Sequence, residues 1–137
     1  LAAASATLKA LQEQDVIGHL WEQGRRLQDG YNALARAYGL ERITQCVGLP
    51  PRTVMTYRDD AGRESFVYKS LVQQEVIKRG VLFAGYQFVS GAHSTKDVDD
   101  TLRVYRSALE ILAEAVRDGD AERRLEGPPV SPVFRTA

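Results

Sequence analysis

Apolar residues recur at the spacing of a helix face near the start of the chain. In residues 1–11 they fall three or four positions apart, which predicts a short helix. A longer pattern over residues 17–38 predicts a second helix, which ends at Gly39. Asp15 precedes it, and its carboxylate can accept hydrogen bonds from the unpaired N–H groups of the first turn. Because glycine destabilises a helix interior, we expect close packing at Gly24 and Gly30.

Two segments rich in β-branched residues come next. Residues 43–47 and 53–57 predict short strands, and the proline-containing residues 48–52 predict a stiff connection between them. A cluster of turn-forming residues at 59–62 ends the second strand.

The following part of the chain predicts one helix and two further strands. Apolar residues four positions apart over residues 64–79 indicate a helix that closes on Gly80. Residues 81–83 and 88–90 predict brief buried strands on either side of a loop at 84–87.

The strongest helix signal begins at Ser94. Ser94 can cap the helix, and Asp97 stands where the reciprocal carboxylate of a capping box belongs. The apolar residues of this helix share one face: Val98, Leu102, Tyr105, Leu109, Leu112 and Val116. The charged and then proline-bearing residues 119–137 predict an extended tail.

The predicted order is helix, helix, strand, strand, helix, strand, helix. This order indicates an α+β fold, with a two-layer small domain in which helices cover one side of a short, mainly antiparallel sheet. We expect three parts: a connecting helix at 1–14, the α+β domain at 15–118 and the tail at 119–137.

Composition narrows the class of protein. The 137 residues are 44% hydrophobic, and 18 basic side chains balance 18 acidic ones, as in one ordinary soluble domain. The absence of a basic stripe argues against nucleic acid as a partner, and no apolar run is long enough for a membrane span. The single cysteine, Cys46, favours a reducing compartment, so we expect a cytoplasmic protein.

The chain begins with Leu1, which suggests a piece of a longer polypeptide or a processed product.

Few side chains could carry catalysis. The imidazole bases are His19, on a predicted helix, and His93, beside the predicted cap of the last helix, where holding the turn by hydrogen bonds is the simpler role. Cys46 lies in a predicted strand and is most simply a small buried side chain. The four lysines stand among polar neighbours, which does not favour a nucleophilic amine. No cluster has metal-ligand spacing.

Residues 80–83 and 88–102 carry a family resemblance. The sequence Gly-Val-Leu-Phe, followed by Phe-Val-Ser-Gly-Ala-His-Ser and an acidic helix start, resembles the C-terminal signature of class III pyridoxal-phosphate-dependent aminotransferases, within the glutamate-1-semialdehyde 2,1-aminomutase-like branch. The alanine-rich start of the chain is similar to the helix that leaves the large domain of those enzymes. The similarity spans about residues 1–116.

The resemblance implies the C-terminal small domain of a fold-type I enzyme. The large domain, with the lysine that binds pyridoxal 5′-phosphate, would lie upstream, so this chain alone would bind no cofactor and catalyse nothing. The resemblance further implies a homodimeric parent enzyme acting on an amine, amino-acid or keto substrate. Tyr86 and Gln87 are then the expected substrate-binding residues, and Ser90 and His93 form a structural turn near the site.

The loop at residues 84–88 departs from the family pattern. It has no glutamate, which puts aminomutase activity in doubt, and no arginine that could hold a substrate carboxylate. This uncharged loop favours an aminotransferase for a different amine or ketone, such as a sugar or a β-amino compound. Two alternatives remain: a stand-alone α+β binding or interaction module without cofactor, and a cysteine-dependent enzyme using Cys46 and His93.

Overall fold

The computed structural model describes residues 1–131, and the last six residues of the predicted tail lie outside this range. The elements follow in the order α1 (Ala2–Glu13), α2 (Val16–Ala37), β1 (Thr44–Leu49), β2 (Arg52–Tyr57), α3 (Phe66–Lys78), β3 (Tyr86–Phe88), α4 (Thr95–Asp118) and the 3₁₀ helix η1 (Ala121–Arg124). This is the predicted order, and the α+β class is confirmed. Within the described range, no helix combines the length and apolar character that a membrane crossing requires.

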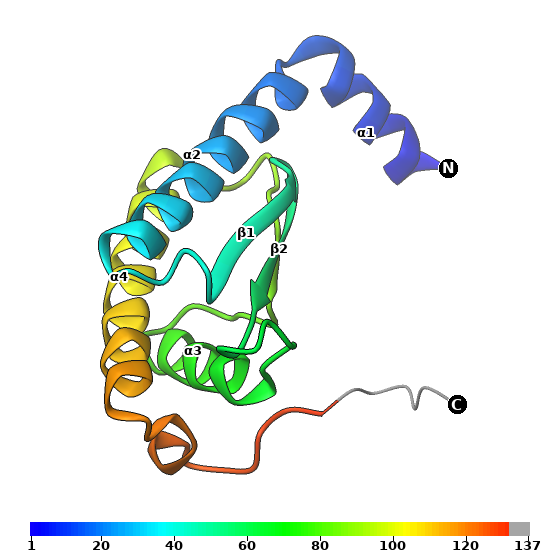
Figure 1. The fold of residues 1–137 in the computed structure, drawn as a ribbon. Coiled ribbons are helices and arrows are strands. Elements are labelled where there is room, and N and C mark those ends of the chain that lie inside the picture. The colour runs from blue at the N-terminus through cyan, green and yellow to red at the C-terminus, as the bar shows by residue number, and fades with distance from the viewer. Residues whose placement is uncertain (132–137) are drawn as a thin grey trace.

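The three strands form one antiparallel sheet in the order β1-β2-β3. Arg52 of β2 stands between Leu49 of β1 and Phe88 of β3, and Val54 stands between Val47 and Tyr86. Helices α2 and α3 contact the strands, and α4 packs against both helices. The helices therefore cover one face of the sheet, whereas α1 projects away from it (Figure 1).

The strands near the site differ from the prediction. Residues 81–83 form no strand, and β3 consists of residues 86–88, of which 86 and 87 were predicted as loop and only 88 as strand. Sequence periodicity could not reveal this, because β3 is too short to show alternation and is defined by pairing with β2. Phe88 was expected to be buried, but it is 57% exposed.

Two boundaries also shift. The connection between the first two strands is a tight hairpin turn at residues 50–51, because β1 continues to Leu49. Helix α3 begins at Phe66 instead of residue 64, because Glu64 forms a β-bridge with Arg58 and the Ser65 hydroxyl caps the helix. The predicted caps at Asp15 and Ser94 are confirmed, the latter as a complete capping box with Asp97.

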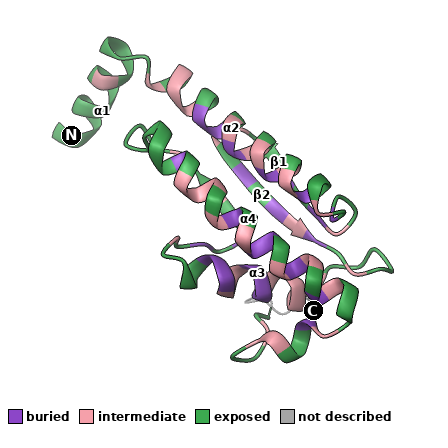
Figure 2. Cartoon of the chain, turned by 90° about the vertical axis from the view of Figure 1, so that its left-hand side faces the viewer, coloured by how far each residue is buried: buried purple, intermediate pink, exposed green. Residues whose placement is uncertain are grey.

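The core lies between the helices and the covered sheet face, and buried residues line the facing sides of the elements (Figure 2). Tyr31 and Tyr105 meet edge to face at its centre, with ring centroids 5.2 Å apart. The Tyr31 hydroxyl lies 2.7 Å from the Thr44 hydroxyl and also donates to Tyr57. No buried side-chain polar atom of the described residues lacks a partner, so this core contains a satisfied polar network.

Gly24 and Gly30 inside α2 mark close packing, as predicted. A Cβ atom at Gly24 would lie 2.1 Å from the backbone oxygen of Pro50, at the hairpin turn. At Gly30 it would lie 2.6 Å from a terminal methyl of Leu102 on α4. Glycine is therefore what lets α2 approach the hairpin.

The start of the predicted tail is part of the folded unit. Helix η1 packs against α3 and α4, and Ala121 is buried. Beyond it the chain passes along α3, where Gln74 bonds to backbone atoms of residues 124 and 126, and the Ser70 hydroxyl accepts the Val130 N–H. The prediction of an extended tail is therefore wrong for residues 121–124, which form η1, whereas the chain beyond them has no helix or strand and is bonded to α3. Charge and proline content did not show that these residues would be bonded to α3.

We expect α1 to fray in solution. None of its residues is buried, Leu8 is 62% exposed, and a helix of 12 residues is marginal in water without tertiary packing. Amide hydrogen exchange of the 137-residue chain should show protection in α1 far below that in α4. Self-association through α1 is the alternative way to cover its apolar face, and it would appear as a concentration-dependent mass. A monomer with α1 protected as strongly as α4 would contradict the prediction.

Candidate functional site

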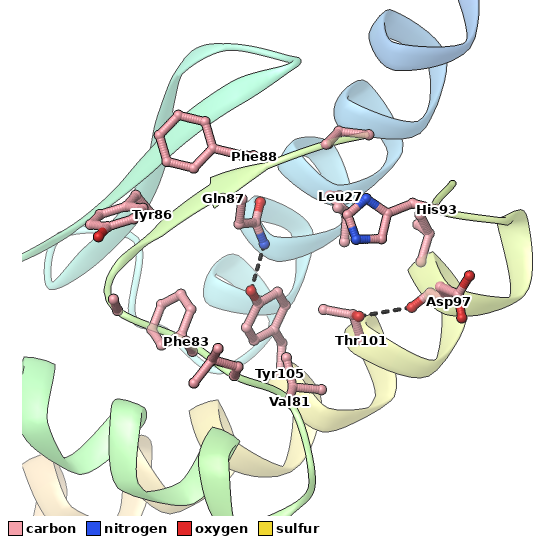
Figure 3. Close-up of a pocket in the computed structure, with 14 residues that line it drawn as sticks. Leu27, Val81, Phe83, Tyr86, Gln87, Phe88, His93, Asp97, Thr101 and Tyr105 are labelled. Atoms are coloured by element: carbon pink, nitrogen blue, oxygen red, sulfur yellow. Dashed lines mark hydrogen bonds between the residues drawn. The ribbon is translucent and has the colours of Figure 1, made fainter. Parts of the chain in front are cut away.

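A cavity of about 360 Å³ lies between β3, the segment before it and the first half of α4. Figure 3 shows Phe83 and Tyr105 at its base and Asp97 and Thr101 on its α4 side. Tyr86, Gln87 and His93 line the same cavity. The structure therefore brings three of the four predicted site residues together, and the fourth, Ser90, contacts His93.

Gln87 is held at both ends of its side-chain amide. Its Oε1 accepts a hydrogen bond of 2.9 Å from the Thr53 hydroxyl, and its Nε2 donates one of 2.5 Å to the Tyr105 hydroxyl (Figure 3). These bonds tie β3 to β2 and to α4, and thereby fix which face of β3 points outward. Free hydrogen-bonding capacity remains at each end of the amide.

His93 closes the turn between β3 and α4. The Ser90 N–H donates to His93 Nδ1 at 2.9 Å, so that nitrogen carries no proton in this arrangement. The His93 carbonyl oxygen lies 2.8 Å from Nε2 of His19, which ties the turn to α2.

A negative charge stands at the α4 end of the cavity. Side-chain and backbone hydrogen bonds from Ser94 to the Asp97 carboxylate lower the pKa of Asp97. This carboxylate is engaged in the capping box with Ser94. Asp97 contributes to the cavity lining, and its backbone oxygen accepts the Thr101 hydroxyl on this side (Figure 3).

The outward face of the sheet is apolar and uncovered by the described residues. Tyr86 is 52% exposed, and its ring meets that of Phe88 edge to face at 5.4 Å. Three aliphatic side chains of the neighbouring strands are also exposed on this face: Val47, Leu49 and Val54. A contiguous exposed apolar patch of this kind usually marks an interaction surface or a ligand groove.

Arg52 stands on the same outward face and was missed by sequence reasoning. Its guanidinium lies 5.4 Å from the centre of the Phe88 ring, because the strand register places the two residues directly opposite each other. Residues 84–88 themselves contain no arginine, and β2 supplies one opposite Phe88. The alternation of Arg52 with Val54 puts both on one strand face, but the pairing with β3 could not be read from the sequence.

Cys46 is a buried thiol on β1. It is 2% exposed, and burial raises its pKa, although a hydrogen bond with Thr53 opposes this. His93 lies in the turn before α4, whereas Cys46 belongs to the core cluster. This arrangement gives no support to a cysteine-dependent enzyme.

We expect Cys46 to resist alkylation in the native state. Iodoacetamide at neutral pH should modify it at least 100-fold more slowly than an unfolded control in urea, because the thiol is buried and protonated. Mass spectrometry over time measures both rates. Native-state labelling as fast as that of the unfolded chain would show that the thiol is accessible.

Comparisons with known proteins agree with the fold. No family model matches the chain. It is 27% identical to the glutamate-1-semialdehyde 2,1-aminomutase of Natronomonas pharaonis over 80% of this chain, and 31% identical to that of Syntrophobacter fumaroxidans over 83%. It spans 32% and 28% of those proteins, or about three tenths of their length.

A solved structure is similar over most of this chain. The pyridoxal-phosphate internal aldimine form of the FumI protein of Sphingopyxis sp. MTA144 matches with a TM-score of 0.71 and 27% identity, covering 86% of this chain and 27% of that one. The fold is therefore that of part of a pyridoxal-phosphate enzyme. More particularly, the chain is a distant homologue of part of the glutamate-1-semialdehyde 2,1-aminomutases, which are class III aminotransferase-type enzymes.

The described residues do not themselves fit pyridoxal phosphate. The cofactor requires a lysine whose amine is activated by burial or by a neighbouring cation. Lys9, Lys78 and Lys96 instead pair with carboxylates, and the hydrogen bond that Lys78 donates to the Glu126 carboxylate raises the pKa of Lys78. The fourth lysine, Lys69, is only partly buried and lies 5.9 Å from the centre of the Phe66 ring. We therefore assign no cofactor contact within residues 1–131.

Proposed function

We propose that this chain is the C-terminal, substrate-side domain of a pyridoxal-phosphate-dependent aminotransferase or aminomutase-like enzyme. It would shape the substrate pocket and not catalyse by itself. The observation that carries the proposal is the homology to part of an aminomutase, combined with a sheet face that the described residues leave uncovered. The cofactor and its lysine would belong to a segment outside this chain.

The exposed apolar surfaces support this arrangement. Tyr86 and Phe88 on the sheet, together with Leu8 and Trp21 of the first two helices, are each 38% or more exposed. Covering apolar area of this kind is favourable by about 25 cal/mol per Å². A large domain packed against these surfaces would stabilise both parts and would enclose the edge of β3.

The site residues would then have distinct roles. Tyr86 points outward and would contact the amine or keto substrate. Gln87, with its amide held by Thr53 and Tyr105, would present β3 in a fixed orientation and offer its remaining hydrogen-bonding capacity. The turn closed by Ser90 and His93 would keep β3 and the start of α4 in register.

The test is the intact mass and cofactor content of the native gene product, purified from its own cells. A mass several times 15.2 kDa, with about one pyridoxal phosphate released per chain in alkali, is the expected result. The protein should also transfer an amino group from at least one amine to a keto acid.

A mass near 15.2 kDa without cofactor would overturn the proposal. The stand-alone binding module would then be the better account, because the cavity and the uncovered sheet face would be surfaces of the whole protein. A larger mass without pyridoxal phosphate would also contradict the proposed reaction, while leaving the docking of a second domain intact.

A further inference from the structure

We propose that the cavity of about 360 Å³ binds the non-reacting end of the substrate, and that this end is an uncharged apolar group with one acyl oxygen, such as that of an amide. The Tyr105 hydroxyl would donate a hydrogen bond to this oxygen. The proposal rests on the proposed function and specifies its substrate class. The reacting amine or keto group would lie outside the cavity, toward the cofactor.

The Tyr105 hydroxyl has an unused donor inside the cavity. Tyr105 is only 1% exposed, and its oxygen accepts the Gln87 amide at 2.5 Å (Figure 3). The Thr53 hydroxyl donates to the other end of that amide, which fixes this direction of bonding. Within residues 1–131 no oxygen accepts the Tyr105 proton, although burial raises the pKa of Tyr105 and keeps the proton in place. Buried hydroxyl donors normally have a partner, and the cavity offers room for one.

The base of the cavity suits an apolar body. The Phe83 ring meets the Tyr105 ring edge to face, with centroids 5.8 Å apart. Val98 of α4 and Leu27 of α2 line the same space and belong to the buried core. Small-molecule sites typically combine such walls with a few polar groups in a volume of about 300–1,000 Å³. One hydroxyl in an apolar base therefore matches a ligand with one acceptor atom.

The lining favours an uncharged ligand. Among the described residues, no lysine or arginine lines the cavity, and its one carboxylate, Asp97, is taken up by Ser94. A ligand carboxylate would lose water without gaining a cation, which is strongly unfavourable. His93 adds a neutral donor, because the Ser90 N–H occupies its Nδ1 and leaves the ring proton on Nε2. This agrees in class with the uncharged substrate that residues 84–88 had favoured.

The experiment compares three probes on the native gene product. N-methyl phenylpropanamide has an uncharged acyl oxygen, propylbenzene has no oxygen, and phenylpropanoate is an anion. None carries an amine or a ketone, so none can undergo amino-group transfer. Dissociation constants are measured by ligand-observed NMR titration for the natural protein and two variants. Tyr105→Phe removes the donor, and Tyr31→Phe makes the same change at a buried tyrosine that does not line the cavity.

We expect the natural protein to bind the amide more tightly than propylbenzene or the acid. Tyr105→Phe should weaken amide binding by about 5- to 10-fold, since one neutral hydrogen bond is lost, and should change propylbenzene binding by less than about twofold. Tyr31→Phe should keep the natural preference. Thr101→Phe, which adds a ring on the α4 side of the cavity, should abolish binding of both uncharged probes. This variant tests the location even if Tyr105→Phe fails to fold.

Four results would each overturn the inference, whatever cofactor the protein contains. They are binding of no probe, tighter binding of the acid than of the amide, equal weakening of amide and propylbenzene by Tyr105→Phe, and undiminished binding to Thr101→Phe. Binding of no probe would mean that water is the partner of the Tyr105 hydroxyl. A Tyr105-dependent preference for the amide in a protein without pyridoxal phosphate would support the cavity site and refute the proposed reaction.

Discussion

Replacing Gly24 with alanine should lower the free energy of unfolding by about 3 kcal/mol. The added methyl would lie 2.1 Å from the Pro50 oxygen and 2.4 Å from the Pro50 carbonyl carbon. Both atoms belong to the backbone of a hairpin turn that contains two prolines, so α2 and the sheet would have to separate. The gain in helix propensity of up to about 1 kcal/mol is too small to offset this strain.

Gly30→Ala is the matched control because it makes the same change in the same helix. Its methyl would approach only side-chain carbons of Leu102, which is partly exposed and can rotate away. We expect it to change stability by less than about 1 kcal/mol. Urea unfolding of both variants measures the difference. Equal losses in both would show that glycine in α2 matters for a reason other than contact with the hairpin.

The second large effect is expected at alkaline pH, where the free energy of unfolding should fall steeply as pH rises above 10. Burial raises the pKa of Tyr31 to about 12 and raises the pKa values of Tyr57 and Tyr105 well above the usual 10. Below pH 10 these tyrosines are protonated in both the folded and the unfolded state. Above pH 10 only the unfolded state releases their protons, so it gains stability as pH rises. Each tyrosine then removes about 1.4 kcal/mol per pH unit, and the three together about 4 kcal/mol.

Urea unfolding between pH 9 and pH 12 tests this expectation. Tyr105→Phe should reduce the slope of stability against pH by about one third, apart from any constant loss due to the missing bond to Gln87. The exposed Tyr86 provides the control, and Tyr86→Phe should leave the slope unchanged. A slope that does not respond to Tyr105→Phe would mean that the ring is accessible to water in the native state.

The helices could be predicted from sequence because their signals are local. Asp15 and Ser94 accept backbone N–H groups three residues ahead, and the apolar face of α4 repeats over about five turns. Strand β3 and the segment beyond Asp118 could not be predicted, because contacts distant in sequence define them. Gln87 pairs with Thr53 across 34 residues, and Val130 bonds to Ser70 across 60.

In the candidate site, too, some residues could be selected from the sequence and others needed the structure. Tyr86, Gln87 and His93 were selected by a family resemblance, and the structure gathers them around one cavity. Arg52 needed the register of the sheet, since only the pairing of β2 with β3 places it opposite Phe88.

The bonding of residues 124–130 to α3 also determines where an expressed form of this protein can end. Asp118 looks like a natural end point for a truncated protein, because Gly119 ends α4 in a left-handed conformation. It would, however, lose Ala121 from the core and remove the backbone partners of Ser70 and Gln74. A truncation, a purification tag or a fusion should therefore be placed after Val130. Secondary structure alone would place it a dozen residues earlier, at the end of α4.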